Sequence, residues 1–251
     1  MGISQGFRSA LWVILFSLST SALSTTEAPD QLRLSLNHWP PFGLSEQRPY
    51  QGIDYDVATE LARRMGLSVS VIPCSFKRCL AAAKAGQIDL IGGIAKNTER
   101  IRYLQYLSPH YSVVSVAFYL PSGTAHKIES YSDLFKLRIG SVSKSHYFSP
   151  FNEDKRIQKV EVPTEAKLLN LLKAGRIDAI IGTNPNIEYQ ASQLNMSAAI
   201  KPANFDPDAN VKIFFAIPRA SRFSRGAKEF SQILTEMIDD GTIDEITLKY
   251  R

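Results

Sequence analysis

A short internal repeat places the strongest constraint on the fold of this 251-residue chain. The sequence Lys-Ala-Gly-Gln-Ile-Asp at residues 84–89 recurs as Lys-Ala-Gly-Arg-Ile-Asp at residues 173–178. Each copy follows an apolar helical pattern and leads into a short apolar run, and its glycine supplies the left-handed residue that commonly ends a helix. Two copies are too few for a solenoid, which needs at least about three units. The repeat therefore predicts two α/β lobes of similar build.

The remaining periodic segments agree with an alternation of strands and helices. Apolar residues recur at every second position in some segments and at helical spacing in others. Thr164 is expected to cap the helix that precedes the second copy of the repeat. Such alternation favours a mainly parallel sheet with flanking helices in each lobe, the α/β class. Strands are expected at residues 32–36, 67–71, 111–120, 139–142, 160–162 and 211–217, and helices at residues 54–65 and 221–240.

Residues 1–24 have the pattern of a secretory signal peptide. They contain no acidic residue, a single arginine, an apolar run at residues 11–16 and then mostly small residues. The apolar run is far shorter than the roughly 20 residues that a membrane-spanning helix needs. Cleavage after Ala22 or after Ser24 fits the pattern, and we favour Ser24; the alternative is a buried N-terminal helix. Because no cysteine directly follows the apolar run at the cleavage region, we expect a soluble protein of the Gram-negative periplasm without a lipid anchor.

Composition and charge exclude several other classes of protein. Hydrophobic residues make up 44% of the chain and charged residues 21%, which rules out a disordered or multi-span membrane protein. The net charge is +5, but the basic residues are scattered, so we expect no nucleic-acid partner. The four histidines lack metal-ligand spacing, and nucleotide-binding, zinc-protease and Gly-x-Ser-x-Gly motifs are absent. Residues 141–144 match Ser-x-x-Lys, but its companion motifs Ser-Asp-Asn and Lys-Thr-Gly are absent, so we interpret the match as chance. We therefore expect a monomer with no metal, no cofactor and no catalytic residue.

The two cysteines are interpreted from the compartment that the leader indicates. Cys74 and Cys79 lie five positions apart, and in an oxidising compartment a local disulfide is expected between them. On the chain-entropy model so small a loop contributes only roughly 2 kcal/mol to stability. Two buried free thiols and a redox pair are the alternatives, and the spacing is not the Cys-x-x-Cys of a redox pair.

Four stretches of the chain resemble the family 3 extracellular solute-binding proteins, the periplasmic receptors of polar amino-acid ABC transporters. They are Trp-Pro-Pro-Phe at 39–42, Gly-Ile-Asp-Tyr-Asp-Val at 52–57, the segment 86–100 that ends in Thr-Glu-Arg, and Gly-Thr-Ile-Asp-Glu-Ile at 241–246. Their order and spacing match the family across almost the whole mature chain. The resemblance implies a two-lobed periplasmic binding protein type II fold, with a solute cleft between the lobes and hinge closure around the solute.

The resemblance also implies how the chain is divided. Lobe one would comprise residues 25–118 and 212–251, and lobe two would be residues 119–211, inserted between them. Together they would form a single solute-binding domain of about residues 30–251. Long or low-complexity linkers are absent from the sequence, so strands are expected to join the lobes.

The family's solute contacts fall on identifiable residues of this sequence. Arg100 matches the arginine that clamps the solute carboxylate, to which a guanidinium offers two parallel donors; the alternative is a surface arginine. Trp39 matches the ring that stacks on the solute, and Phe76 matches an apolar wall position, although both could equally be core. Gly93 would let the backbone approach the solute closely. The positions expected to bind solute are Trp39, Phe42, Phe76, Gly93, Ala95, Arg100, Ser145, His146 and Thr183.

Two of these positions depart from the family pattern in the same direction. The family usually has Ser or Thr at the position of Ala95 and an acid at that of Thr183, and both accept hydrogen bonds from the α-amino group of the solute. A buried ammonium costs on the order of 1–3 kcal/mol for each missing acceptor. We therefore expect a carboxylate-bearing solute whose α-amino group is absent or held differently. Lys144 and His146 replace a glycine and a threonine of the family, and they would add positive charge if they reach the cleft.

The predicted function is capture of a small carboxylate-bearing solute, an amino acid or a related compound, and its delivery to the permease of an ABC transporter. The resemblance leaves two alternatives open. One is a periplasmic enzyme similar to the cyclohexadienyl dehydratases, which share this fold and size. The other is a receptor whose closed lobes dock on a membrane sensor.

Overall fold

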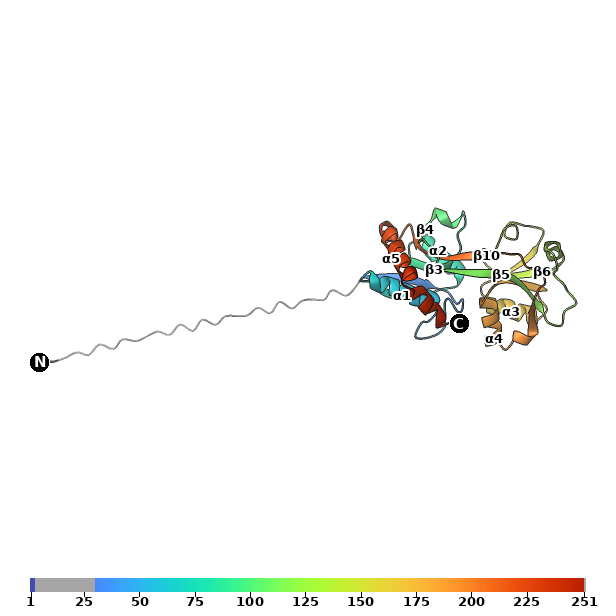
Figure 1. Cartoon of the computed structure of the whole chain (residues 1–251), viewed down its shortest axis with the longest axis horizontal. Coiled ribbons are helices and arrows are strands. Elements are labelled where there is room, and N and C mark those ends of the chain that lie inside the picture. Colours follow the sequence, from blue (N-terminus) through green and yellow to red (C-terminus); the bar gives the residue numbers. More distant parts are fainter. Residues whose placement is uncertain (3–29, 251) are drawn as a thin grey trace.

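The computed structural model describes residues 1–2 and 30–250, and residues 30–250 form two α/β lobes connected by strands (Figure 1). Apart from its first two residues, the predicted signal peptide lies outside the described residues. No helix in the described ranges is both long and apolar enough to cross a membrane.

The described residues contain ten strands and six α-helices. The strands are β1 (Gln31–Leu36), β2 (Ser68–Pro73), β3 (Leu90–Ile94), β4 (Leu104–Tyr106), β5 (Ser112–Pro121), β6 (Arg138–Val142), β7 (Gln158–Val162), β8 (Ala179–Asn184), β9 (Ile200–Pro202) and β10 (Asn210–Pro218). The α-helices are α1 (Ile53–Arg64), α2 (Phe76–Lys84), α3 (Glu165–Lys173), α4 (Asn186–Gln193), α5 (Ala227–Asp239) and α6 (Thr242–Leu248). Short 3-10 helices are η1 (Arg100–Arg102), η2 (Tyr131–Lys136), η3 (Ser197–Ala199) and η4 (Ser224–Gly226).

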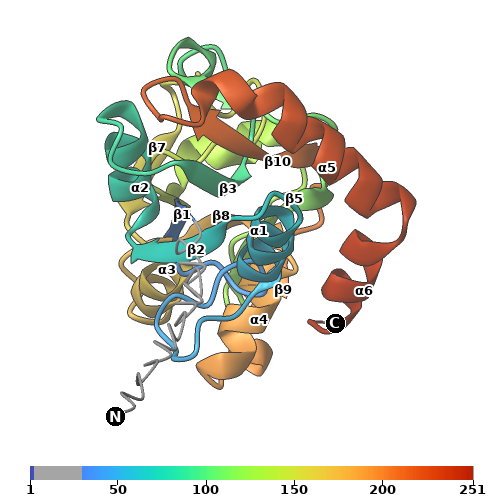
Figure 2. The same ribbon diagram turned by 90° about the vertical axis from the view of Figure 1, so that its left-hand side faces the viewer.

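The first lobe contains a sheet whose two faces are covered by different helices. β1 pairs in parallel with β2 and β3, and β10 pairs antiparallel with β3 and β4. Side chains alternate along β10, so that Ile213, Phe215 and Ile217 pack with α1, α5 and α6, whereas Phe214 and Ala216 pack with α2. Figure 2 shows α2 on the opposite side of the lobe from α5 and α6.

The second lobe repeats this layered arrangement. β6 pairs in parallel with β7 and β8, and β5 pairs antiparallel with β8. On β8, Ile180 packs with α3 and α4, whereas Ile181 packs with Phe118 and Phe151 on the opposite face. Because both faces are covered, β8 begins with three consecutive buried apolar residues, Ala179 to Ile181. The predicted α/β class with flanking helices in each lobe is confirmed, but the sheet of each lobe is mixed and not mainly parallel, because β10 and β5 pair antiparallel with their neighbours.

Two strands, β5 and β10, run from one lobe into the other. They pair antiparallel where Ser112–Ser115 of β5 meets Asn210–Ile213 of β10. Beyond this stretch β5 continues beside β8 and β9, and β10 continues beside β3 and β4. The lobes are thus joined by strands, as the absence of long linkers predicted.

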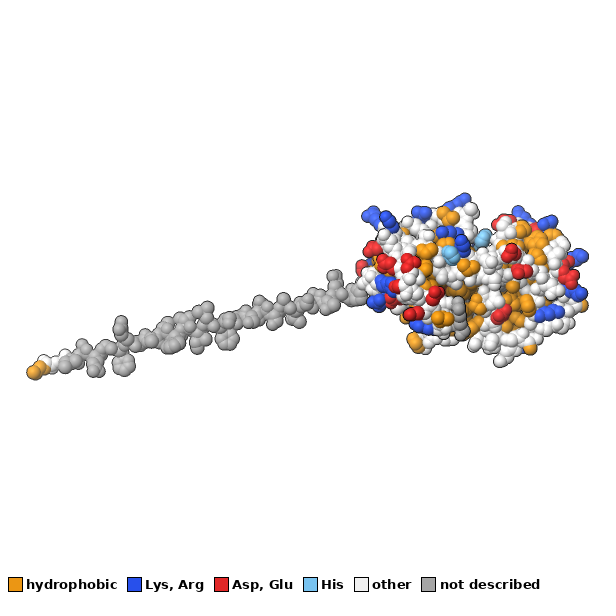
Figure 3. Space-filling view, in the orientation of Figure 1, with side chains coloured by type: hydrophobic (Ala, Val, Ile, Leu, Met, Phe, Trp, Pro, Cys, Tyr) orange, Lys and Arg blue, Asp and Glu red, His pale blue; other side chains and the backbone are white. Residues whose placement is uncertain are grey.

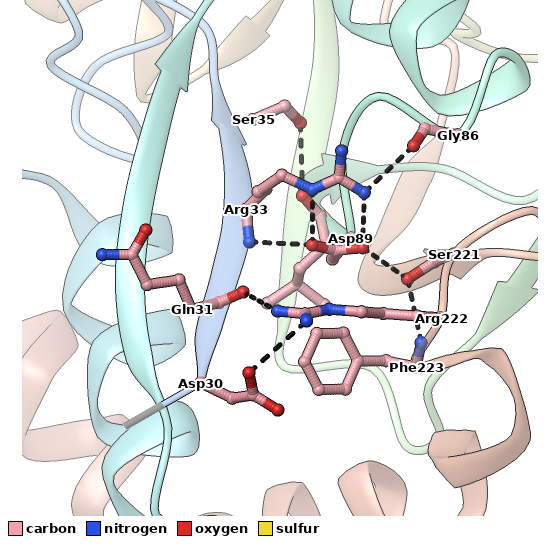
Figure 4. Close-up of polar contacts among 10 residues, drawn as sticks. Asp30, Gln31, Arg33, Ser35, Gly86, Asp89, Ser221, Arg222 and Phe223 are labelled. Atoms are coloured by element: carbon pink, nitrogen blue, oxygen red, sulfur yellow. Dashed lines mark hydrogen bonds and ion pairs between the residues drawn. The ribbon is translucent and has the colours of Figure 1, made fainter. Parts of the chain in front are cut away.

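The first copy of the repeat ends at a buried aspartate that ties three segments together (Figure 4). Asp89 accepts hydrogen bonds from the backbone and side chain of Arg33 on β1, at 2.8 to 3.1 Å, and from the Ser221 hydroxyl at 2.7 Å. Arg33 also donates to the carbonyl of Gly86 at 3.0 Å. Burial pushes the pKa of Asp89 up, but these hydrogen bonds outweigh burial and leave the pKa below its ordinary value. The carboxylate is therefore charged and paired.

The second copy makes the same connection in the other lobe. Asp178 accepts from the backbone N–H of Arg138 on β6 at 2.8 Å and from its guanidinium at 2.7 and 3.0 Å, and Arg138 donates to the carbonyl of Gly175 at 2.9 Å. Gly86 and Gly175 have φ values of +68° and +65°, which glycine adopts without steric cost. The repeat therefore corresponds to one structural device, a helix end fastened to an arginine of the adjacent parallel strand.

We expect Asp89→Ala to destabilise the protein more than Asp178→Ala. The Asp89 side chain has no exposed surface, whereas that of Asp178 is 18% exposed. Both variants lose hydrogen bonds to a partly exposed arginine, but Asp89→Ala also leaves the buried Ser221 hydroxyl without its acceptor, at a further cost of about 1–3 kcal/mol. Urea unfolding of both variants measures the difference in free energy of unfolding. Equal losses in free energy of unfolding for the two variants would mean that the greater burial of Asp89 adds no stability.

One predicted helix is shorter than the sequence pattern indicated. The segment 221–240 was expected to be helical throughout, but α5 begins at Ala227. Ser221 lies outside the helix because its hydroxyl donates to Asp89, and Arg222 donates to the chain entering β1 at 2.7 Å. These tertiary contacts outweigh the helical periodicity of the first six residues.

The structure joins Cys74 and Cys79 in a disulfide. Cys74 follows β2 and Cys79 lies in α2, and their Cα atoms are 5.4 Å apart. Cys79 is buried against the first-lobe sheet. The bridge fastens the first turn of α2 to the end of β2, and α2 begins at Phe76.

Candidate functional site

A cavity of about 360 Å³ lies between the two lobes. In Figure 3 the surface is notched between the two halves of the molecule, and histidine side chains lie beside the notch. Eight of the nine positions expected to bind solute line this cavity: Trp39, Phe76, Gly93, Ala95 and Arg100 from the first lobe, and Ser145, His146 and Thr183 from the second. The fold thus brings together residues that the motifs singled out in separate parts of the chain.

Arg100 is a buried cation in the cavity wall, with only 2% of its surface exposed. Its guanidinium donates to the carbonyl of Ala95 at 2.9 Å and to that of Lys144 at 2.6 Å, and it lies 5.2 Å from the centre of the Phe76 ring. Burial lowers the pKa of Arg100 from its ordinary value, yet a guanidinium remains protonated in proteins. A guanidinium has five N–H donors, so donors remain to bind an anion.

Phe42 is the one predicted binding residue that does not line the cavity. A tight turn folds the chain back here, with hydrogen bonds of 2.8 and 3.0 Å between the backbones of Trp39 and Gly43. The turn places the Phe42 ring against the Trp39 ring, with centroids 4.3 Å apart and planes 18° from parallel. Phe42 therefore supports Trp39 from the core, and only Trp39 faces the cavity.

Gly93 is fixed by a hydrogen-bonded chain that the sequence did not reveal. Its backbone N–H donates to the Tyr111 hydroxyl at 3.0 Å, and that hydroxyl donates to the carboxyl group of Asp54. A Cβ at Gly93 would lie 2.9 Å from Asp54 Oδ2 and 3.2 Å from the Trp39 ring, so only glycine fits. Burial raises the pKa of Asp54 to about 7, against the opposing hydrogen bond from Tyr111.

The loop after β6 reaches the cavity with Ser145 and His146, but the side chain of Lys144 is exposed. Lys144 instead contributes its carbonyl to Arg100, and it has a φ of +67°, the conformation for which glycine is suited. Burial, and secondly the charge of Arg100, lower the pKa of His146, so this ring is neutral at pH 7. The expected gain of positive charge from Lys144 and His146 is therefore wrong.

The two departures from the family pattern both lie in the cavity wall. The carbonyl of Ala95 is occupied, because Arg100 and the Tyr106 hydroxyl both donate to it at 2.9 Å. Thr183 lies on β8 opposite Val116 of β5. Within the described residues the Thr183 hydroxyl makes no hydrogen bond, so it is the polar group that this position offers to a solute.

Glu165 is a buried acid of the site that the sequence did not single out. It is the first residue of α3, it lines the cavity, and only 8% of its surface is exposed. Burial raises the pKa of Glu165 to about 7. The N-cap Thr164, which accepts from the backbone of Lys167 at 3.3 Å, was predicted, but sequence alone gave no sign that the next residue faces a cleft. Other polar residues of the wall that were not predicted are Asn37, His38, Glu46, Arg78 and Tyr147.

Two hydrogen bonds cross directly between the lobes. Asn186, at the start of α4, donates to the carbonyl of Pro40 at 2.8 Å, and Arg100 donates to the carbonyl of Lys144. Asn186 is fully buried, and its Oδ1 has no partner among the described residues. The structure therefore represents a closed arrangement of the lobes.

The cleft extends beyond the first cavity. A second cavity of about 380 Å³ shares His38, Glu46 and Thr164 with it and is bounded by polar side chains of α4. Within the described residues no group of three or more His, Cys, Asp or Glu side chains is arranged to hold a metal ion.

One protein family matches the sequence of this chain, and its match agrees with the two lobes, the strands that join them and the cleft. The family model for bacterial extracellular solute-binding proteins, family 3, matches residues 34–251. This chain belongs to that family.

The solute-binding protein is similar to relatives from several bacteria. It is 26% identical to a probable histidine-binding protein of Campylobacter jejuni over 170 residues, which cover 63% of this chain and 62% of that protein. It is 24% identical to the lysine/arginine/ornithine-binding periplasmic protein of Escherichia coli over 250 residues, 94% of each chain.

Solved structures agree with this fold. An ancestral arginine-binding protein bound to arginine matches with a TM-score of 0.75 at 24% identity, covering 89% of this chain and 99% of that one. A histidine kinase sensor domain with similarity to periplasmic binding proteins matches with a TM-score of 0.77 at 19% identity, covering 89% and 96%. These likenesses confirm the predicted two-lobed periplasmic binding protein type II fold.

Proposed function

We propose that this protein captures a small carboxylate-bearing solute, an amino acid or a related compound, and delivers it to the permease of an ABC transporter. The observation that carries the proposal is Arg100, a permanently charged guanidinium that is 2% exposed in the wall of an inter-lobe cavity. A buried cation requires an anionic partner, and a carboxylate matches the two-donor geometry of arginine. The relatives named for histidine and for lysine, arginine and ornithine support an amino acid or related solute.

Capture proceeds by closure of the lobes around the solute. The solute enters the open cleft, Arg100 binds its carboxylate, and Trp39 stacks on its body. The lobes, which we assign to residues 25–118 with 212–251 and to residues 119–211, then close. Asn186 meets Pro40 across the cleft in the closed form. A solute can drive this step only by binding the closed form more tightly than the open one.

The protein acts outside the cytoplasm, as the name of its family states, and we propose that residues 1–24 direct its export and are removed after Ser24. It works as a periplasmic monomer whose closed form the permease recognises. A membrane sensor is the alternative partner, because a histidine kinase sensor domain has the same fold.

We propose that the cleft binds its solute without chemical change. The relatives described above are binding proteins, which supports this assignment over a dehydratase. Incubation with prephenate tests it directly, because a dehydratase of this fold would convert that carboxylate.

A thermal-shift screen of the purified protein tests the proposed function. The probes are amino acids, di- and tricarboxylates, small peptides and prephenate. A solute at about 100 times its dissociation constant stabilises the fold by about 2.7 kcal/mol, which visibly raises the unfolding midpoint. A hit without product formation, accompanied by a smaller radius of gyration in X-ray scattering, is the expected result. No stabilisation by any carboxylate, an unchanged scattering profile with a saturating hit, or turnover of prephenate would contradict the proposal.

A further inference from the structure

We propose that Glu165 binds a protonated nitrogen of the solute, an ammonium or a guanidinium group, and replaces the family's hydroxyl at the position of Ala95 and the family's acid at the position of Thr183. The inference rests on the proposed function, because it assumes that the solute occupies the cavity between the lobes. It assigns to the solute two charged groups, a carboxylate at Arg100 and a cation at Glu165.

Among the described residues, the only hydrogen-bond donor to the Glu165 carboxyl group is the backbone N–H of Glu165 itself. Within residues 30–250 no other residue makes a hydrogen bond or an ion pair with it, although more than nine-tenths of its surface is buried. A buried carboxylate without a partner is costly, and proteins pair such groups or keep them neutral. The open side of Glu165 is the cavity, so a solute can supply the partner.

A purely structural role at the helix start explains Glu165 less well. An acid in the first turn of α3 interacts favourably with the helix dipole, but an exposed side chain gains this stabilisation without losing water. Thr164 already caps the helix through its hydroxyl. Burial of the Glu165 carboxyl group in a cavity wall therefore adds a cost that helix stability does not require.

The other acid of the cavity differs from Glu165 in its exposure. The Glu46 side chain is 72% exposed and lies 3.9 Å from His38 at the edge of the cleft. Glu165 is the acid that a solute inside the cleft would meet away from water, where an ion pair is strongest. The phenolic oxygen of the neighbouring Tyr147 accepts the Val142 N–H at 3.0 Å, and within residues 30–250 Tyr147 makes no hydrogen bond with Glu165.

The buried cation and the buried acid of the cavity wall lie on opposite lobes. Arg100 comes from the first lobe, together with Arg78, and Glu165 comes from the second. A solute with a carboxylate and a protonated nitrogen would therefore contact both lobes through charge-assisted hydrogen bonds. Contacts of this kind exist fully only when the lobes are closed, so they favour closure.

Calorimetric titration of three related probes tests the inference. L-arginine carries both an α-ammonium and a guanidinium group, L-citrulline keeps only the α-ammonium, and 5-guanidinopentanoate keeps only the guanidinium. L-lysine and L-histidine are further cationic probes, and glutarate and succinate are dicarboxylates without a cation. Each is titrated into the wild type, Glu165→Gln and a matched control, Glu161→Gln, which changes an exposed acid of β7 outside the cavity.

We expect the tightest probe of the wild type to be cationic, and Glu165→Gln to weaken its binding at least tenfold while Glu161→Gln leaves it unchanged. If Glu165→Gln weakens the binding of arginine and of citrulline but not that of 5-guanidinopentanoate, the α-ammonium is the bound group. If Glu165→Gln weakens the binding of arginine and of 5-guanidinopentanoate but not that of citrulline, the guanidinium is the bound group. Equal binding of cationic probes by wild type and Glu165→Gln, or a dicarboxylate as the tightest probe, would overturn the inference and leave the proposed function intact. Failure of every probe to bind would count against both.

The glutamine variant is expected to fold, because it has nearly the same shape and buries no charge. Its urea unfolding midpoint, measured beside that of the wild type, separates loss of binding from loss of structure. Glu165→Asp provides a second check, since it keeps the charge but shortens the side chain. It should retain part of the affinity for the cationic probe, whereas a role in shape alone predicts the opposite order of the two variants.

Discussion

Replacing Arg100 with alanine is expected to weaken solute binding by roughly 30-fold or more. Truncating one partner of a buried, hydrogen-bonded charge pair costs about 2–5 kcal/mol, and about 1.4 kcal/mol corresponds to a factor of ten in affinity. Arg100 meets this description, because it is 2% exposed and lines the cavity. The variant leaves the solute carboxylate in the cleft without its cation.

Arg102 provides the matched control, since it lies in the same short helix, η1, and is exposed. Calorimetric titration with the solute found in the screen should give the wild-type dissociation constant for Arg102→Ala. The affinity of Arg100→Lys should lie between that of the wild type and that of Arg100→Ala, because lysine keeps the charge but lacks the planar two-donor geometry. If Arg100→Ala keeps its circular dichroism spectrum and binds as tightly as the wild type, Arg100 is not the carboxylate clamp.

The parts of the fold that the sequence predicted are those set by local periodicity. The apolar patterns around residues 32–36 and 139–142 correspond to β1 and β6, and the repeat corresponds to the connection of each helix end to its sheet. Errors arose where a tertiary contact competes with periodicity. Ser221 is the clearest case, because its hydrogen bond to Asp89 holds it outside a helix that its sequence would continue.

The candidate site was predictable to the extent that motifs mark its backbone positions. Arg100 and Trp39 could be located by motif, since each sits at a fixed place relative to a strand or turn. Glu165 could not, because its burial depends on the second lobe closing over a cavity. The contact of Asn186 with Pro40 joins residues from different lobes, and no local pattern records such a pair.

Stability is expected to fall as the pH rises from about 4 to above 7, with Asp54 as a main cause. Asp54 is 3% exposed, and burial raises its pKa from 3.8 to about 7, against the opposing hydrogen bond from Tyr111. Between these values the folded protein keeps the Asp54 proton and the unfolded chain has lost it. The free energy of unfolding therefore decreases with pH in this window, by at most about 1.4 kcal/mol per pH unit for one such group.

Other buried groups contribute to the same pH range. Glu165, whose pKa burial raises to about 7, adds a decrease of the same sign. Burial lowers the pKa values of His38 and His146, so these histidines contribute stability that increases with pH.

The Asp54 contribution is isolated by subtracting the curve of Asp54→Asn, an uncharged side chain whose carbonyl oxygen can still accept from Tyr111. The free energy of unfolding of this variant, minus that of the wild type, should be more negative near pH 5 than at pH 8.

Urea unfolding at half-unit steps from pH 4.5 to 9 measures both curves. The difference between them should change with pH up to about 7 and then level off, because both states of the wild type are ionised above that point. Tyr111→Phe removes the hydrogen bond that lowers the Asp54 pKa, so it should shift the levelling point to higher pH. Parallel curves for wild type and Asp54→Asn would show that Asp54 is ionised in the folded protein. In that case the chain from Asp54 through Tyr111 to Gly93 would place a negative charge, and not a neutral carboxyl group, behind the cavity wall.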